Sequence, residues 1–486
     1  MKTLLKGKYV IGHKNDDHSI IENGEVVFKD DTIIFVGKNY EGEYDRLIDK
    51  KNAVISPGFI DLNAIGDIDH DLLHMEVEKD KQNNLEWSQE YYQKGPHEFM
   101  TPEEEAFKSL YNFVYLIMNG VTTALPITSV LYKKWAETYE EAVAAVHNAG
   151  NLGLRLYFGP SYQYGAKVVN KDGEKEVVWD KEKGSKGLEN AVKFIKFFDG
   201  AYNGLIRGML APERIETQTK DSLIKTKEYS EELDCPVRLH AAQGLFDYKE
   251  IKRRYNKTPI GFLNEINFLD KNIAIPHAHY VSGSSKVKEE HEKDLEYLKK
   301  SNTTVIHCPL IINRHGSPLE TFAKYYKNGI NMGTGTDTYP PDYFQLIRNG
   351  SMVSRIFEND LKGSRFADLY RASTLGGARF LNRDDLGKIT PGAKADIIVI
   401  NIDEFEIGPI DDPIRTMFLS GSGKNVEMSI IDGKIVMQDR KIEGINLDKL
   451  KNRAQCYFDK MKKGYKERSY QSLEPGTLFK SSFPQW

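Results

Sequence analysis

Short apolar runs separated by turn-forming residues open the chain. Residues 9–11, 25–28 and 32–36 are rich in Val, Ile, Tyr and Phe, and the clusters 22–24 and 29–31 stand between them. β-branched and aromatic runs at this spacing are typical of strands joined by tight turns. The first part of the chain is therefore predicted to form a small antiparallel sheet.

From Pro57 onward the pattern changes to short apolar strands alternating with long charged helical segments. Residues 153–158 and 236–240 are two of the predicted strands. A helix is predicted over 101–119, because Thr101 is a capping residue and Pro102 suits the first helical position. Strands and helices that alternate in this way are typical of an α/β protein, and their extent from Pro57 to about Asn382 fits a (β/α)8 TIM barrel.

A β-rich pattern returns at 387–400 and continues through 426–436, with a hairpin turn predicted at Asp432-Gly433. The predicted organisation is a small β-sandwich domain made from both chain ends, with the barrel inserted between its two parts. The expected boundaries are 1–56 and 385–445 for the sandwich, 57–384 for the catalytic barrel, and 446–486 for a C-terminal helix and tail.

Composition and charge exclude several classes of function. The chain has 486 residues, 40% of them hydrophobic, and a net charge of -4 from interleaved acidic and basic residues. An interleaved, nearly neutral surface is not that of a nucleic-acid-binding protein or a membrane-binding basic face. No apolar run reaches the roughly 18 residues needed to span a bilayer. Charge interrupts the N-terminus too early for a secretory signal, so a cytoplasmic protein is expected.

The three cysteines, Cys235, Cys308 and Cys456, are odd in number and far apart. This spacing does not predict a disulfide framework.

Several separated segments carry a family resemblance. They are Pro57-Gly58-Phe59-Ile60-Asp61, the Gly-Val-Thr-Thr of 120–123, and the segments 372–381, 387–400 and 431–436. In this order they resemble the amidohydrolase superfamily, in the branch of cytosine deaminase, guanine deaminase and triazine hydrolase. The resemblance implies a barrel with its active site at the C-terminal mouth of the strands.

The resemblance also implies a metal site. His240, His277 and Asp337 stand at the family's strand-five, strand-six and strand-eight positions and are the expected ligands of one divalent metal ion, Zn or Fe. Imidazole and carboxylate suit such ions. Asp337, together with His277, is the expected catalytic residue, because the family's strand-eight aspartate accepts a proton from the attacking water.

Three positions depart from the family pattern. The strand-one histidines would fall at 63 and 65, where this chain has Asn63 and Ile65, and Gln243 replaces the glutamate that shuttles protons. An amide cannot titrate near neutral pH and cannot act as a general acid or base. Gln243 is therefore expected to bind substrate instead, and Asn63 is expected to be a substrate-binding amide or a weak oxygen ligand.

Other residues are candidates for substrate binding or for compensating the lost histidines. His279 shares a strand face with His277, and Tyr162 and Arg314 follow predicted strands. Asp67, Asp69 and His70 lie just beyond the first strand and could reach the mouth; the alternative is a solvated acidic loop.

Three functions remain open at this stage. The first is a hydrolase that acts on a C–N bond of a small polar nitrogen heterocycle through metal-activated water, by deamination or by ring or amide hydrolysis. The second is a metal-independent acid/base enzyme on the same barrel, and the third is a non-catalytic ligand-binding relative. The expected partner is a small-molecule substrate. A homodimer is expected from base rates and from the aromatic C-terminal tail.

Overall fold

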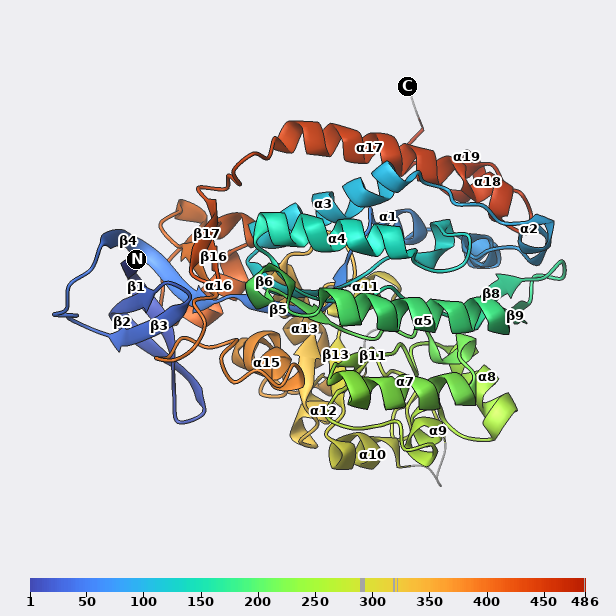
Figure 1. The fold of residues 1–486 in the computed structure, drawn as a ribbon, viewed down its shortest axis with the longest axis horizontal. Helices are drawn as coiled ribbons and strands as arrows, with labels where there is room; N and C mark the ends of the chain where they lie inside the picture. The colour runs from blue at the N-terminus through green and yellow to red at the C-terminus, as the bar shows by residue number, and fades with distance from the viewer. Residues whose placement is uncertain (289–292, 318–319, 321, 485) are drawn as a thin grey trace.

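Strands from both ends of the chain join in one mixed sheet of seven strands. The computed structural model describes residues 1–288, 293–317, 320, 322–484 and 486. In sheet order the strands are β17 (Lys434–Gln438), β16 (Val426–Ile431), β15 (Ile397–Asn401), β4 (Arg46–Pro57), β1 (Lys2–Lys14), β2 (Asp17–Lys29) and β3 (Thr32–Gly37). This sheet occupies one end of the molecule (Figure 1).

The predicted β-rich unit made from both chain ends is confirmed, with one difference. β15 pairs antiparallel with β4, and β4 pairs parallel with β1, so the two parts are joined by hydrogen bonds in a single sheet rather than in two separate ones. An apolar cluster that includes Val10, Ile55 and Val399 fills its interior. The hairpin at Asp432-Gly433 forms as predicted, between β16 and β17.

The rest of the fold is built on two parallel four-stranded sheets. The first contains β5 (Phe59–Ile65), β6 (Val121–Ile127), β7 (Arg155–Phe158) and β10 (Ile206–Gly208). The second contains β11 (Val237–Arg238), β12 (Ile273–Pro276), β13 (Thr304–His307) and β14 (Met332–Thr334). All strand pairs within both sheets are parallel, in agreement with the predicted α/β class.

Backbone contacts join the two sheets along both edges. A parallel bridge pairs Leu210, just beyond β10, with Val237 of β11. On the opposite side the amide of Asp337, beyond β14, donates to the carbonyl oxygen of Asn63 in β5 at 2.9 Å. The residues that follow the strands of both sheets are therefore brought together.

Helices surround these sheets and alternate with their strands along the chain. The longer ones are α3 (Pro102–Met118), α4 (Tyr139–Leu152), α5 (Lys181–Phe198), α7 (Lys220–Leu233), α8 (Leu245–Tyr255), α10 (Asp294–Ser301), α13 (Tyr343–Glu358) and α16 (Pro413–Ser420). Shorter ones are α1 (Asp71–His74), α2 (Gln89–Lys94), α6 (Ala201–Gly204), α9 (Pro259–Glu265), α11 (Pro309–Arg314), α12 (Phe322–Lys327), α14 (Phe366–Arg371) and α15 (Gly377–Phe380). A hairpin of β8 (Gly165–Val169) and β9 (Lys175–Trp179) is inserted before α5.

Helix α3 begins where the sequence predicts. The side chain of Thr101 accepts from the amide of Glu104, and the carboxylate of Glu104 accepts from the amide of Thr101. This reciprocal capping box satisfies two amide groups that a helix start otherwise leaves unpaired.

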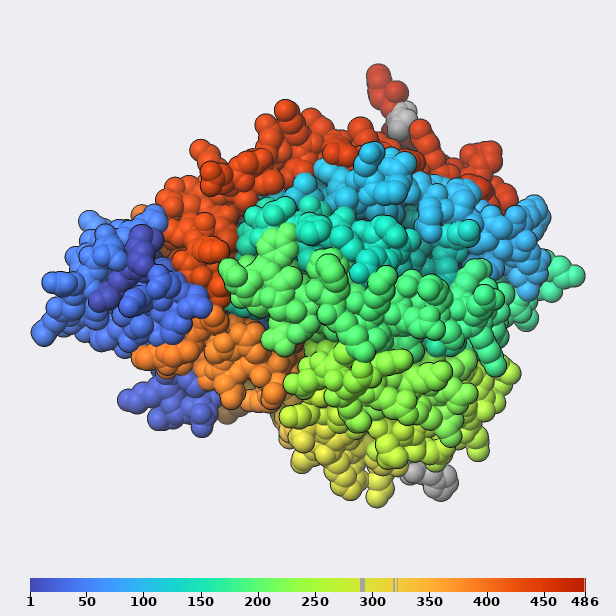
Figure 2. All heavy atoms as spheres, viewed as in Figure 1, coloured from blue at the N-terminus to red at the C-terminus, as the bar shows by residue number. Residues whose placement is uncertain are grey.

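The C-terminal segment packs on its own chain. Helices α17 (Leu447–Lys463), α18 (Tyr465–Arg468) and α19 (Pro475–Leu478) lie along the segment that contains α3 (Figure 2). Met461, Tyr465 and Phe479 share an apolar cluster with Phe107 and Tyr132. Tyr465 and Phe479 are therefore buried within one chain, whereas Phe483 and Trp486 near the C-terminal end are exposed, and the expected homodimer stays a prediction. None of the helices in the described part of the chain is long and apolar enough to cross a membrane.

Candidate functional site

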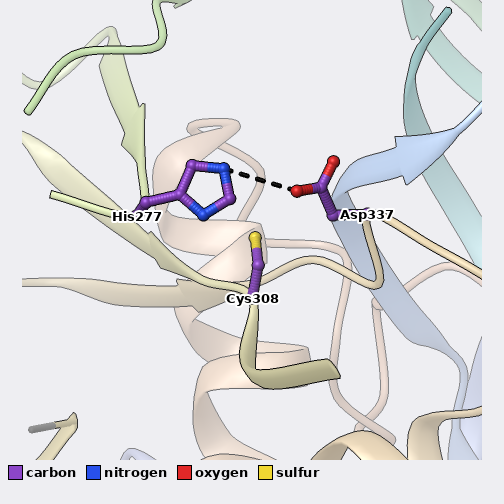
Figure 3. A group of neighbouring side chains, drawn as sticks. All are labelled: His277, Cys308 and Asp337. Atoms are coloured by element: carbon purple, nitrogen blue, oxygen red, sulfur yellow. Dashed lines mark ion pairs between the residues drawn. The ribbon is translucent and has the colours of Figure 1, made fainter. Parts of the chain in front are cut away.

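Three strand ends bring an imidazole, a thiol and a carboxylate together. His277 follows β12, Cys308 follows β13, and Asp337 lies just beyond β14 (Figure 3). Nε2 of His277 lies 3.3 Å from Oδ2 of Asp337. The three side chains place their possible ligand atoms within 4.8 Å of one another.

The backbone at these strand ends is strained. His277 (φ 68°), Ala278 (φ 50°) and Asp337 (φ 55°) adopt left-handed conformations, as does Ala242 (φ 57°) near His240. Each such non-glycine residue costs on the order of 1–3 kcal/mol, and such residues cluster at active sites and ligand clamps. Hydrogen bonds hold the conformation, including that from the amide of His277 to the carbonyl oxygen of Ile306 at 2.9 Å. The strain indicates a functional geometry.

His240 lies beside this group with its ring orientation fixed. Nδ1 contacts the carbonyl oxygen of Glu213 at 3.2 Å. A carbonyl oxygen can only accept, so Nδ1 carries the hydrogen and Nε2 keeps its lone pair, the usual arrangement of a metal-binding histidine. The His240 and His277 ring centroids are 5.6 Å apart. Burial holds the pKa of both imidazoles well below the ordinary histidine value, which keeps them in the neutral form that binds metals.

His277 has unmet bonding capacity. The side chain is fully buried, and neither ring nitrogen has a hydrogen-bond partner among the described residues. Orphaned buried polar atoms are rare and call for a ligand or a catalytic role. Burial also raises the pKa of Asp337 well above its usual value. A cation between these two groups would favour the carboxylate form of Asp337. The residues therefore fit a divalent ion.

A cavity of about 510 Å³ opens above the strand ends, and Asp337 reaches its wall. Gln243, Asp67, Asp69 and His70, which the sequence singled out, also line it. The segment 67–70 is not a solvated acidic loop, because Asp67 and His70 are buried. Nδ1 of His70 bonds the hydroxyl of Tyr132 at 2.5 Å, and Asp69 accepts from the amide of Tyr339 at 2.9 Å.

Asp67 is committed to a buried ion pair. Its Oδ1 lies 2.9 Å from Nζ of Lys108, and both side chains are almost completely inaccessible. The amide of Ser129 also contacts the carboxylate, at 3.2 Å. These contacts give Asp67 a role in fixing the cavity wall.

Tyr162 does not reach the cavity, which corrects the sequence-based expectation. Its side chain is fully buried, and its hydroxyl bonds Oγ1 of Thr226 in α7 at 2.7 Å. Side chains alternate along an extended chain, and here the neighbouring Gln163 faces the cavity instead.

Arg314 and His279 lie near the site without lining the cavity. Nη1 of Arg314 donates to Oγ1 of Thr338 at 2.7 Å, and a second nitrogen donates to the carbonyl oxygen of Tyr339. Arg314 therefore braces the loop that carries Asp337. The buried ring of His279 lies 5.8 Å from that of His277. Asn63 is buried with its Oδ1 unpartnered.

Sequence reasoning missed Glu213 and Arg214, which line the cavity. Nε of Arg214 donates to Oε1 of Glu213 at 3.0 Å, and Nη1 donates to Oε1 of Gln243. Both residues follow β10, and charged residues beyond the end of a parallel strand are typical of an active site. This pattern in the sequence could have identified them.

Cys308 was also passed over. The ring of His307, its neighbour, lies 5.5 Å from the ring of Phe322 in the helix layer. Strand side chains alternate, so Cys308 faces the opposite way, towards His277 and Asp337.

Comparison with known proteins agrees with this architecture. The model of the "Amidohydrolase family" matches residues 54–436. A 5-methylthioadenosine/S-adenosylhomocysteine deaminase of Thermococcus sibiricus is 26% identical over 90% of this chain and 94% of its own. A 5'-deoxyadenosine deaminase of Methanosarcina acetivorans is 24% identical over 94% of this chain and 98% of its own.

Among solved structures, an adenosine deaminase of Xanthomonas campestris with bound zinc superposes with a TM-score of 0.77 and 17% identity, over 94% of this chain and 98% of its own. An atrazine chlorohydrolase of Arthrobacter aurescens complexed with zinc superposes with a TM-score of 0.76 and 16% identity, over 94% of this chain and 100% of its own. At these identities the likeness establishes the fold.

Proposed function

The chain belongs to the amidohydrolase family, and we propose that it is a hydrolase that removes the amino group of an adenosine-like aminopurine by adding water across a C–N bond. The reaction converts the aminopurine and water into the oxopurine and ammonia. Two relatives named as deaminases of adenosine derivatives support this substrate class, because they align along nearly the full length of both chains.

The observation that carries the proposal is the convergence of His240, His277 and Asp337 at one strained set of strand ends. These three groups would hold one divalent ion, since two imidazoles and a carboxylate form a recognised open metal set. Such an ion supplies Lewis acidity and lowers the pKa of water towards neutrality. We favour zinc over iron, because two zinc-containing proteins share the fold.

The chain's own residues then position the substrate and move the proton. Asp337 accepts a proton from the attacking water and returns it to the departing ammonia. Gln243 cannot titrate, so its amide holds the substrate by hydrogen bonds while Arg214 fixes its orientation. A cavity of about 510 Å³ lies within the range of roughly 300–1,000 Å³ that is usual for small-molecule sites.

We also propose that the two parallel sheets close into the (β/α)8 barrel expected over 57–384. The bridge between Leu210 and Val237 and the bond between Asp337 and Asn63 support closure on both edges. The sandwich boundaries at 1–56 and 385–445, the homodimer and the cytoplasmic location stay predictions. Neither the metal-independent enzyme nor the non-catalytic relative gains support from the comparisons.

Ammonia release tests the proposal directly. The purified protein, prepared without chelators, is offered adenosine, 5'-deoxyadenosine, methylthioadenosine and S-adenosylhomocysteine, and its metal content is measured. Turnover with at least one substrate and a stoichiometric ion are expected. His240→Ala removes both, whereas His147→Ala, on the exposed face of α4, changes neither. A folded, metal-loaded protein that releases no ammonia from any of the four would contradict the substrate class.

A further inference from the structure

Two positions in β5 at which the resemblance places metal-binding histidines carry other residues, so a ligand from another strand could replace them. Position 65 is Ile65, which offers no ligand atom. Position 63 is Asn63, whose Nδ2 donates to Sγ of Cys308 at 3.9 Å. The residue that stands where the resemblance places a histidine therefore contacts a thiol from a neighbouring part of the site.

Cys308 faces the interior of the strand ring. It is buried and belongs to an apolar cluster with Ile306, Leu62 and Ala274. In Figure 3 its sulfur points towards the space between His277 and Asp337. The side chain of Asp337 is 14% exposed and lines the cavity, whereas His277 and Cys308 lie buried beside it.

The geometry is close to that of a bound ion. Ligand atoms around a tetrahedral zinc are roughly 3.3–3.8 Å apart, as metal–ligand distances of about 2.0–2.3 Å require. The distance of 3.3 Å between Nε2 of His277 and Oδ2 of Asp337 already matches this ligand–ligand spacing. The possible ligand atoms of His277, Cys308 and Asp337 all lie within 4.8 Å of one another.

Two independent observations point to a ligand at this place. Neither ring nitrogen of His277 makes a hydrogen bond among the described residues, although Nε2 lies 3.3 Å from Oδ2 of Asp337, and the buried Oδ1 of Asn63 also has no hydrogen bond there. A cysteine with a purely structural role would pack only against apolar side chains. Cys308 instead contacts the amide of Asn63 and lies beside the imidazole of His277.

We propose that Cys308 is a metal ligand, binding as a thiolate beside His277 and Asp337 in place of the missing strand-one histidines. The inference rests on the metal-dependent function proposed above. Binding exchanges the thiol proton for the divalent ion, releases that proton to solvent and involves no redox change. Asn63 is a positioning residue, because its amide hydrogen bond to the sulfur supports the thiolate. A sulfur ligand selects zinc over the harder ions magnesium, calcium and manganese.

X-ray absorption on the unmodified protein loaded with one equivalent of zinc gives the decisive test. A zinc–sulfur distance of about 2.3 Å is expected beside nitrogen and oxygen at about 2.0–2.2 Å. A bound zinc with only nitrogen and oxygen neighbours would overturn the role of Cys308 and leave the proposed deaminase intact. A protein that binds no zinc would overturn both.

Cobalt provides the matched comparison of variants. The cobalt-loaded protein is expected to show a near-ultraviolet sulfur-to-cobalt charge-transfer band. Cys308→Ser removes the band and weakens metal affinity at least about tenfold, as expected when one of few ligands is lost. Cys456→Ser, which changes an exposed cysteine on α17, keeps both. A band that persists in a folded Cys308→Ser protein contradicts the proposal. If that variant does not fold, the zinc–sulfur distance of the unmodified protein still decides the question.

Discussion

At the residue scale, the site depends on a few side chains held in unfavourable backbone conformations. His277 and Asp337 are both left-handed, and each follows a strand that ends one to three residues earlier. The surrounding sheets stabilise these strained conformations, because the amides of both residues donate hydrogen bonds to neighbouring strands. Small changes to these side chains should therefore affect chemistry more than folding.

The first prediction concerns the proposed proton acceptor. Asp337→Asn keeps the shape of the side chain and removes its basicity, so kcat should fall by about 10²–10⁴. The melting temperature should change little. Steady-state kinetics measure the first quantity and circular dichroism the second.

Asp199→Asn, at an exposed position outside the cavity, is the control and should leave kcat unchanged. An Asp337→Asn enzyme with more than a tenth of the original kcat would exclude Asp337 as the essential base.

The second prediction concerns pH and a pair at the cavity rim. Nε2 of His315 bonds Oδ1 of Asp71 at 2.7 Å, and this hydrogen bond raises the pKa of His315. A raised folded-state pKa gives stability that is fully present below the unfolded value of about 6.5 and is lost as pH rises through the folded value. His315 is 44% exposed, so solvent screening limits the effect to about 1 kcal/mol or less.

Thermal unfolding across the neutral range measures this dependence. His315→Gln should flatten the decline of stability from slightly acidic to slightly alkaline pH, and His147→Gln should not. Equal pH profiles for His315→Gln and the unmodified protein would refute the assignment.

At the scale of elements, short strands position the site, and strand ends, loops and short helices line the cavity above it. β12 and β13 span only Ile273–Pro276 and Thr304–His307, so each presents few side chains to the interior. The alternation of one such strand decides that Cys308 points inward and His307 outward. Helix α3 supports this arrangement from outside, because Lys108 on it pairs with Asp67 in the cavity wall.

The third prediction concerns the start of α3. Thr101→Ala removes the side-chain half of the capping box and should lower the free energy of unfolding by about 1 kcal/mol. Denaturant unfolding measures it. Thr390→Ala, in a loop outside any helix, should stay within about 0.5 kcal/mol. Equal losses in the two variants would show that the cap contributes nothing specific.

At the scale of the whole molecule, one buried arginine connects the parallel strands to the mixed sheet. Nε of Arg155 in β7 donates to Oδ2 of Asp396 at 2.9 Å, and its Nη2 reaches Oδ1 of Asp432 at 3.2 Å. Asp396 precedes β15 and Asp432 lies in the β16–β17 turn, so this ion pair joins segments from distant parts of the sequence. It is nearly inaccessible to water.

The fourth prediction is that Arg155→Leu strongly destabilises the protein. Removing the guanidinium leaves the buried carboxylate of Asp396 without its cationic partner, which should cost about 3–5 kcal/mol. Calorimetry or denaturant unfolding measures the loss. Arg207→Leu removes an exposed pair with Asp199 and should cost about 1 kcal/mol or less. A similar, small loss in both variants would mean that the buried pair does not connect the two parts energetically.

Local patterns in the sequence were sufficient for much of the fold. The capping signal at Thr101, the turn at Asp432-Gly433 and the returning β-rich pattern at the C-terminal end all depend on neighbours in the chain, and the structure contains each of them. His240, His277 and Asp337 could also be singled out, because they stand at the positions to which the amidohydrolase resemblance assigns metal ligands. The sequence by itself therefore determined the fold class and the three groups on which the proposed chemistry depends.

Only the tertiary structure decided which other side chains join them. The contact between Asn63 and Cys308 joins residues 245 positions apart. The side-chain contacts from Glu213 through Arg214 to Gln243 depend on how two strand ends meet. Tyr162 lies in the core because its hydroxyl bonds Thr226 of α7. The segment around Tyr162 is too short for its hydrophobic periodicity to predict which side chains face inward. Contacts between residues far apart in sequence depend on how the two parallel sheets meet, and no local pattern encodes that arrangement.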